Sequence, residues 1–161
     1  MVTNYWIFKV KDEIGGLFGR RGHVIFDHRT SEGFWAIRER AANGKLEAKA
    51  SQLKKGDYAV FYLVDKDSNR FVGTCILDSG FTQLSEEQAK NIVHREFIDW
   101  NQGVFIKDVH KWAKPLPIKY LKEKESLGQR GVKVGTHFQG SIKEIDHKEY
   151  VAILNEHELA F

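Results

Sequence analysis

Cysteine and proline are scarce in this sequence, with one cysteine and two prolines among 161 residues. A single cysteine excludes a disulfide within the chain and cannot build a thiolate metal site by itself. Cys75 lies in the apolar run Phe71–Leu77, so we expect a buried, unreactive thiol. The chain also lacks internal repeats and low-complexity segments, and its length suits a single domain over residues 1–161.

Long hydrophobic runs are missing as well. No apolar stretch approaches the ~20 residues of a membrane span. The first ten residues are too short for a signal peptide, and Lys9 interrupts them. With 42% hydrophobic and 29% charged residues, the composition is that of a soluble globular protein, which we expect to be cytoplasmic.

Motifs for catalysis and metal binding are absent too. The sequence has no Gly-x-Ser-x-Gly nucleophile motif, and Gly15–Gly19 lacks the Gly-Lys-Ser/Thr ending of a phosphate loop. The seven histidines are scattered, without an i, i+4 pair or a Cys/His cluster. We therefore expect neither catalysis nor a metal or cofactor. A small hydrolase or metal enzyme built on His23, Asp27 and His28 is one alternative.

The net charge of +3 is small but unevenly distributed. Met1 to Gly56 holds 11 lysines and arginines against 6 carboxylates, an excess of five positive charges. A basic surface suits the phosphates of nucleic acid, although the same residues could form an ordinary solvated face.

Hydrophobic patterning predicts more strands than helices. Apolar and β-branched runs predict strands at Asn4–Val10, Phe34–Ile37, Tyr58–Val64, Phe71–Leu77 and Val104–Trp112. Helices are predicted at Lys45–Leu53, at Glu86–Arg95 after a Ser85 capping box, after Pro115 and Pro117, and after Asp146. Glycine-rich Gly15–Gly33 and Leu127–Gly140 are predicted to be loops, the first with at most a short strand at Val24–Phe26. Strands without regular βαβ alternation indicate a small α+β barrel.

Two of the four tryptophans have an unusual setting. Trp35 and Trp100 each stand where an apolar run meets polar, glycine-bearing chain, whereas Trp6 and Trp112 lie within apolar strands. An aromatic ring beside cations can stack on a nucleobase. We therefore expect ligand roles for Trp35 and Trp100, with core packing as the alternative, and core positions for the other two.

Several short motifs resemble those of YTH domains and follow the same order. These are Tyr5–Val10, Phe34–Ile37, Asn43–Ala48, Phe71–Gly73 and Trp100–Phe105. Lys55–Tyr58 and Thr136–Gly140 are more similar to the related EVE domains. The chain thus resembles the YTH/EVE branch of the PUA-like superfamily, which implies an α+β fold with a small mixed β-barrel flanked by short helices.

The resemblance implies a non-catalytic reader of DNA or RNA that captures a flipped methylated base in an aromatic cage, with N6-methyladenine favoured. The implied base-contacting residues are Trp35, Trp100, Phe97, Ala36 and Asp12. The candidate phosphate-binding residues are Lys9, Lys11, Arg20, Arg21, Arg38, Arg40, Arg130 and His137.

Relatives of this kind often form the N-terminal recognition domain of McrB-type modification-dependent restriction subunits. The resemblance therefore implies a targeting role in such a system, with further domains in a parent protein. Two alternatives remain open besides the enzyme. One is a PUA-like module that reads structured RNA by shape, with Trp35 in the core. The other is a protein-interaction domain without affinity for nucleic acid.

Overall fold

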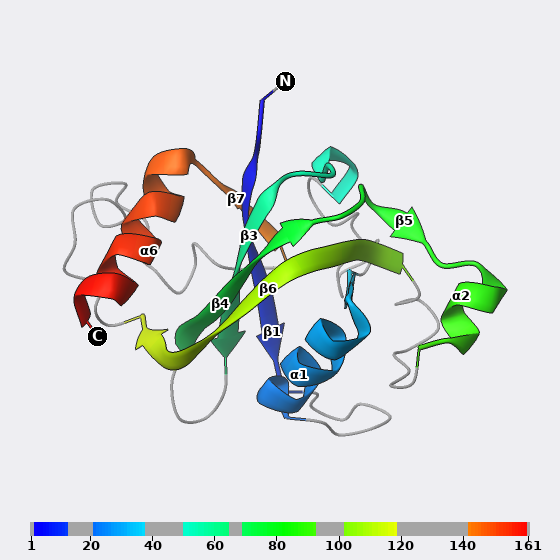
Figure 1. Ribbon diagram of the computed structural model, residues 1–161, viewed down its shortest axis with the longest axis horizontal. Helices are drawn as coiled ribbons and strands as arrows, with labels where there is room; N and C mark the ends of the chain where they lie inside the picture. Colours follow the sequence, from blue (N-terminus) through cyan, green and yellow to red (C-terminus); the bar gives the residue numbers. More distant parts are fainter. Residues whose placement is uncertain are drawn as a thin grey trace.

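The computed structural model describes residues 2–12, 21–37, 50–64, 69–92, 102–118 and 142–160. They form a curled mixed sheet with short helices around it (Figure 1). The strands are β1 (Tyr5–Lys11), β2 (Phe34–Ala36), β3 (Tyr58–Val64), β4 (Asn69–Leu77), β5 (Thr82–Gln83), β6 (Gln102–Pro117) and β7 (Ile142–Ile145). The helices are α1 (Gly22–Glu32), the 3-10 turn η1 (Ala50–Gln52), α2 (Glu86–Lys90) and α6 (His147–Ala160). No helix in this described part is long and apolar enough to cross a membrane.

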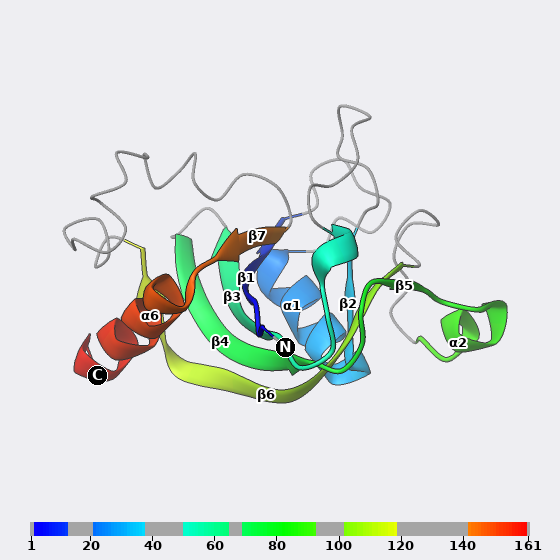
Figure 2. The same ribbon diagram turned by 90° about the horizontal axis from the view of Figure 1, so that it is seen from above.

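The strand order is β2-β6-β4-β3-β1-β7, and β5 pairs with β6 beside β2. β1 and β3 run parallel, and the other pairs are antiparallel. The sheet curls into a half-barrel around α1, and α6 lies on its outer side (Figure 2). This arrangement confirms the predicted α+β class.

The central strands are buried on both faces because each face carries a helix. Trp6 and Phe8 of β1 point into the cluster that α1 covers. The alternate residue Ile7 belongs to a second cluster, which includes Tyr150 and Ile153 of α6. β3 is likewise almost entirely buried, as its unbroken apolar run predicts. The β3–β4 hairpin is confirmed by its antiparallel register.

A buried carboxylate fixes the start of the sheet. Asp57, 2% exposed, accepts hydrogen bonds from the Asn4 amide, the Trp6 indole Nε1 and the Lys54 amide at 3.0, 3.0 and 3.1 Å. Three donors compensate the cost of burying this charge. Asp57 therefore ties the chain before β1 to the turn before β3.

The loop predicted over Gly15–Gly33 is wrong from residue 22 onward, because Gly22–Glu32 is helix α1. Its buried residues are Gly22, Ile25, Phe26 and Arg29, which have helical spacing. Gly33 ends the helix with φ 70, a left-handed conformation that suits glycine, and leads directly into β2. Residues 13–20 lie outside the described residues.

The helix predicted to start at Pro115 and Pro117 and to run through Tyr120 and Leu121 needs correction at its start, since β6 continues through both prolines. Residues 119–121 lie outside the described residues. β2 and β5 pair only with Gln102–Phe105, so in the described part the far end of β6 pairs only with β4. Proline is tolerated at such an edge because the missing N–H costs no ladder hydrogen bond.

The other predicted helices were partly confirmed. The Ser85 capping box opens α2, with Gln88 N to Ser85 Oγ at 3.1 Å and Ser85 N to Gln88 Oε1 at 2.9 Å. The last helix also forms as predicted, with Tyr150 and Ile153 buried. Only Ala50–Gln52 of the run at Lys45–Leu53 is helical among the described residues, as a 3-10 turn. Residues 45–49 and 93–95 lie outside them.

Candidate functional site

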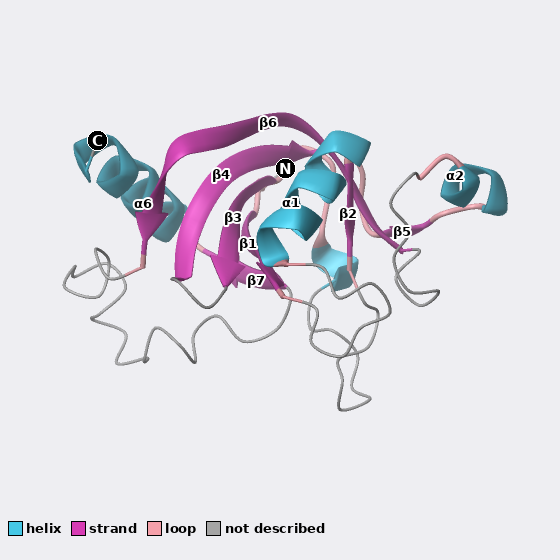
Figure 3. Cartoon of the chain, turned by 90° about the horizontal axis from the view of Figure 1, so that it is seen from below, coloured by secondary structure: helices cyan, strands magenta, loops and turns pink. Residues whose placement is uncertain are grey.

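The end of β1 and the start of α1 lie side by side (Figure 2, Figure 3), and a Cβ at Gly22 would meet the main chain of Lys11 and Asp12. We call Lys11, Asp12, Arg21 and Gly22 at this place the α1 edge. The Asp12 carboxylate accepts a hydrogen bond from the Gly22 amide at 2.6 Å and lies 3.4 Å from the Arg21 guanidinium. Because the Arg21 side chain makes no capping bond at the helix start, Asp12, the residue after β1, supplies the cap.

Trp35 lies inward of this edge and has an exposed fraction of 0%. Two rings from the sheet pack against the Trp35 ring. The Phe8 ring is stacked with its centroid 5.8 Å away, and the Phe61 ring is tilted with its centroid 4.8 Å away. Helix α1 contributes Phe26, in edge contact at 6.4 Å. In this structure the indole is thus a core residue, the alternative that the sequence left open, and it offers no open face to a base.

One polar atom of Trp35 is not satisfied. Its indole Nε1 is buried and has no hydrogen-bond partner in the structure. Unpaired buried donors are uncommon in native proteins and call for a physical explanation. A ligand atom that accepts this hydrogen bond is one such explanation.

Arg29 of α1 covers the same indole. Its guanidinium carbon lies 4.9 Å from the Trp35 ring centroid, and the residue is 5% exposed. A cation over an indole is attracted by the ring, more strongly where water is excluded. Sequence reasoning missed Arg29, and the signal that could have found it is its helical spacing from Ile25 and Phe26.

Ala36 is buried, but on the opposite side of β2 from Trp35. It belongs to a small cluster with Phe34 and Leu84. It pairs with Gly103 of β6, where a Cβ would collide with the Trp35 carbonyl oxygen. Gly103 therefore allows β2 and β6 to approach closely, and this pairing fixes the position of Trp35.

The candidate phosphate-binding residues fall into different places. Arg21, with 55% of its side chain exposed, and Lys11 lie at the α1 edge. Lys9 follows Ile7 on the α6 side of β1, opposite the side from which Phe8 contacts Trp35, so the structure does not bring Lys9 to the indole. Arg20, Arg38, Arg40, Phe97, Trp100, Arg130 and His137 lie outside the described residues.

The structure also places the histidines, the aspartate and the cysteine that the sequence singled out. His23, Asp27 and His28 lie on α1, where Asp27 forms an ion pair with Lys111 at 3.0 Å. Among the described residues, no group of three or more histidine, cysteine or carboxylate side chains could hold a metal. Cys75 is buried as predicted, and burial raises the pKa of its thiol.

Trp6 is fully buried, as the sequence predicted. Trp112 is only partly buried and stacks on His157 of α6, with ring centroids 3.8 Å apart. The core position predicted for Trp112 is therefore half right.

A protein-family model matches most of the chain. The model of the EVE domain family matches residues 4–156. Among curated proteins, no sequence matches this chain.

Solved structures share the fold along nearly the whole chain. A hypothetical protein from Leishmania major has a TM-score of 0.67 and 18% identity, covering 99% of this chain and 98% of that chain. Human THYN1 in complex with DNA containing 5-methylcytosine has a TM-score of 0.62 and 15% identity, covering 96% and 98%. The YTH domain of Zygosaccharomyces rouxii MRB1 in complex with N6-methyladenosine RNA has a TM-score of 0.54 and 14% identity, covering 94% and 85%. At these identities the likeness establishes the fold alone.

Proposed function

The chain belongs to the EVE domain family, and on this premise we propose that it is a non-catalytic module that binds nucleic acid carrying a methylated base. Two proteins with the same fold are recorded with such ligands, THYN1 with 5-methylcytosine DNA and the MRB1 YTH domain with N6-methyladenosine RNA. Fold alone does not determine function, so the proposal depends on what the site can do.

The observation that carries the proposal is the buried, unpaired Nε1 of Trp35. The base of a bound nucleotide can stack on the indole face, while an acceptor of its sugar or phosphate, or of a neighbouring base, lies in the plane of the indole and accepts from its N–H. The binding of a nucleotide at Trp35 therefore satisfies a donor that the protein leaves unsatisfied. Because Trp35 is enclosed, binding requires that a covering group, such as the Arg29 guanidinium, move away from the indole.

The remaining members of the base site are proposed from the family resemblance. Trp100 or Phe97 forms the second aromatic wall, the Ala36 main chain contacts the base edge, and Asp12 accepts from its exocyclic amine. Asp12 already caps α1 through one oxygen, and a carboxylate has about four lone-pair sites, so both roles are compatible. Stacking contributes roughly 1–3 kcal/mol per base, whereas extruding a base from a duplex costs a few kcal/mol.

Phosphate contacts supply the balance of the affinity. Lys11 and Arg21 at the α1 edge lie near the start of a helix, where the dipole also favours anions. Arg20, Arg38, Arg40, Arg130 and His137 are proposed to extend this surface, and Lys9 to contact phosphate from the other side of β1. Each ion pair formed with phosphate releases counterions, so binding should weaken as salt rises.

We propose N6-methyladenine as the favoured base. We also propose that the chain is a targeting domain of a modification-dependent restriction system. The test is titration of the protein with matched oligonucleotides that carry adenine, N6-methyladenine, cytosine or 5-methylcytosine at one position, as DNA and as RNA. We expect at least tenfold tighter binding to one methylated member. Equal affinities across each matched pair would contradict the proposal.

Trp35→Phe tests the role of the unpaired Nε1 directly, because the variant keeps an aromatic ring in the core and removes only the N–H and part of the indole. We expect the variant to fold and to lose about tenfold in affinity for the methylated oligonucleotide, close to the value of one hydrogen bond. Trp112→Phe is the matched control, since Trp112 lies on the α6 side and stacks on His157. Unchanged affinity in Trp35→Phe would remove Trp35 from the base site.

A second function is favoured by the complete burial of Trp35. If the indole is permanently a core residue, the module reads structured RNA by shape and phosphate contacts alone. This candidate predicts equal binding of methylated and unmethylated oligonucleotides with a preserved salt dependence. Binding that is absent, or insensitive to salt, contradicts both candidates and favours a protein-interaction domain.

A further inference from the structure

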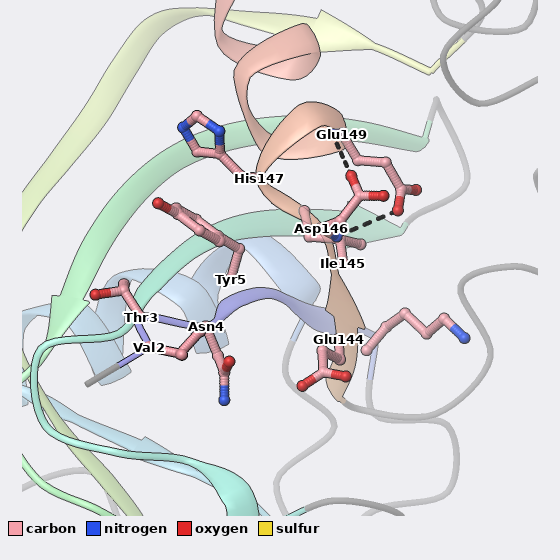
Figure 4. Close-up of a pocket in the computed structure, with 10 residues that line it drawn as sticks. Val2, Thr3, Asn4, Tyr5, Glu144, Ile145, Asp146, His147 and Glu149 are labelled. Atoms are coloured by element: carbon pink, nitrogen blue, oxygen red, sulfur yellow. Dashed lines mark hydrogen bonds between the residues drawn. The ribbon is translucent and has the colours of Figure 1, made fainter.

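The groove shown in Figure 4 does not lead to Trp35. It has a volume of about 580 Å³ and lies between the chain that enters β1 and the junction of β7 with α6. Its lining comes from residues 2–5, 143–147 and 149, and neither Trp35 nor the rings that contact it are among them. Tyr5 in this lining packs with the cluster under α6, whereas Trp35 packs in the cluster under α1. A base therefore does not reach Trp35 through this groove, and a group that covers the indole has to move.

Among the described residues, four groups contact the Trp35 ring, and three of them are aromatic. Phe8 and Phe61 lie on the central strands β1 and β3, and both are fully buried. Phe26 packs on Phe61 as well as on Trp35, with ring centroids 5.1 and 6.4 Å apart. Moving any of these rings opens the core and exposes apolar surface to water. The fourth group is the Arg29 guanidinium, whose N–H donors water or a phosphate can satisfy.

Arg29 reaches Trp35 because α1 leads directly into β2. Arg29 is in the last turn of α1, Gly33 ends the helix, and β2 starts at the next residue. The helix and the strand pack on each other, and the Arg29 guanidinium carbon lies 4.9 Å from the Trp35 ring centroid. A cation in the last turn is also favoured by the partial negative charge of the helix C-terminus. Two attractions thus hold Arg29 in its covering position.

A positive charge is unusual in this part of the core. Arg29 is 5% exposed and shares the buried side of α1 with Ile25 and Phe26. Burying a charge costs free energy, and an apolar side chain of similar volume often leaves a protein equally or more stable. Arginine has a property that an apolar residue lacks, since its flat guanidinium both stacks on aromatic rings and binds phosphate through parallel hydrogen bonds. The residue type therefore fits a group that exchanges a ring for a phosphate.

We propose that Arg29 is the gate of the base site, an inference that rests on the function proposed for Trp35. In the free protein its guanidinium covers the indole and inhibits binding. When nucleic acid binds, the guanidinium leaves the ring for a backbone phosphate, and the base takes its place on the indole. A ligand shifts such an equilibrium only through contacts that favour one of the two states, and the phosphate supplies that contact. The ligand is therefore a methylated nucleotide within a strand, because a free nucleoside has no phosphate to draw Arg29 away.

The first experiment examines the cover without any ligand. Exchange of the indole N–H protons with water is followed by nuclear magnetic resonance of the isotope-labelled chain. Arg29→Ala should speed the exchange of the Trp35 Nε1–H at least tenfold, since water enters the space beside the ring. The Trp6 Nε1–H is the internal control, because it donates to Asp57 inside the core and should keep its rate. An unchanged Trp35 rate, or an equal increase for both indoles, would overturn the gate.

The second experiment tests the phosphate contact with Arg29→Met, which keeps a long apolar cover and removes the charge. We expect this variant to unfold at a urea concentration no lower than that of the parent chain. It should bind the methylated oligonucleotide at least tenfold more weakly, with the slope of log affinity against log salt reduced by about one. Parental affinity and slope in Arg29→Met contradict the gate alone. A parent chain that binds matched methylated and unmethylated oligonucleotides equally contradicts the proposed function itself.

The third experiment compares the oligonucleotide with the free nucleoside of the preferred base, N6-methyladenosine or 5-methyl-2′-deoxycytidine. Removing the cover should strengthen nucleoside binding at least fivefold in Arg29→Ala and weaken oligonucleotide binding, whereas a merely structural role would weaken both. Arg21→Ala is the matched control, since it removes an arginine at the start of the same helix. It should weaken binding of the oligonucleotide and leave that of the nucleoside unchanged. Nucleoside binding that is not strengthened in Arg29→Ala would overturn the proposal.

Discussion

Replacing Trp35 by alanine tests whether this residue is an exposed wall of a base site, as the sequence predicts, or a core residue, as the structure shows. An open cage wall can be removed without much loss of stability, because the ring contributes little to the core. A fully buried indole in contact with Phe8, Phe61 and Phe26 cannot. Trp35→Ala should therefore lower the free energy of unfolding substantially.

The expected magnitude follows from burial. An aromatic side chain buries about 150–250 Å², and about 25 cal/mol per Å² converts this to about 4–6 kcal/mol. Alanine also removes the unpaired Nε1–H, whose burial costs about 1–3 kcal/mol. The difference is about 1–5 kcal/mol, with a midpoint of about 3 kcal/mol, which overlaps the roughly 3–5 kcal/mol usual for such truncations. Trp35→Phe fills most of the space and removes the same donor, so we expect a loss below about 1.5 kcal/mol.

Urea denaturation followed by far-ultraviolet circular dichroism measures both values. The midpoint of Trp35→Ala should fall clearly while its m-value stays that of the parent chain. A loss below about 1 kcal/mol would refute the reasoning, because such a ring cannot be packed into the core. It would also restore the simpler interpretation of Trp35 as an exposed wall.

Three further predictions concern the stability of the sheet and of its buried side chains. Asp57→Ala leaves one buried and two partly buried donors without their acceptor and should cost about 3 kcal/mol in urea denaturation, with less than about 1 kcal/mol expected for the exposed control Asp78→Ala. Gly103→Ala should cost at least about 2 kcal/mol by forcing β2 away from β6, and an unchanged midpoint would contradict this close approach. Burial raises the pKa of Tyr62 and of Tyr150 to about 12, so the folded state holds these protons more tightly than the unfolded chain. Their contribution to stability is complete below about pH 10 and is lost as the pH rises towards 12, which tyrosinate absorbance and alkaline unfolding can follow together.

The strands were predictable because their signal is local. β1, β3 and β4 are short runs rich in aromatic and β-branched residues, and this length and composition identify strands where the period alone does not. Helix α1 was missed because its central Val24-Ile25-Phe26 favours a strand and its inward position Arg29 is charged. Packing against the sheet outweighed these local preferences.

The sequence by itself determined the class of fold, the caps of α2 and α6, the buried cysteine and the resemblance to EVE domains, because all of these are written in short stretches of chain. Tertiary structure decided which residues of distant segments contact one another. Asp57 holds two distant segments together, Asp12 caps helix α1 from the end of β1, ten residues earlier in the chain, and Arg29 covers Trp35. Whether an aromatic ring is a wall or a core residue depends on the groups that cover it, and they come from elements far along the chain.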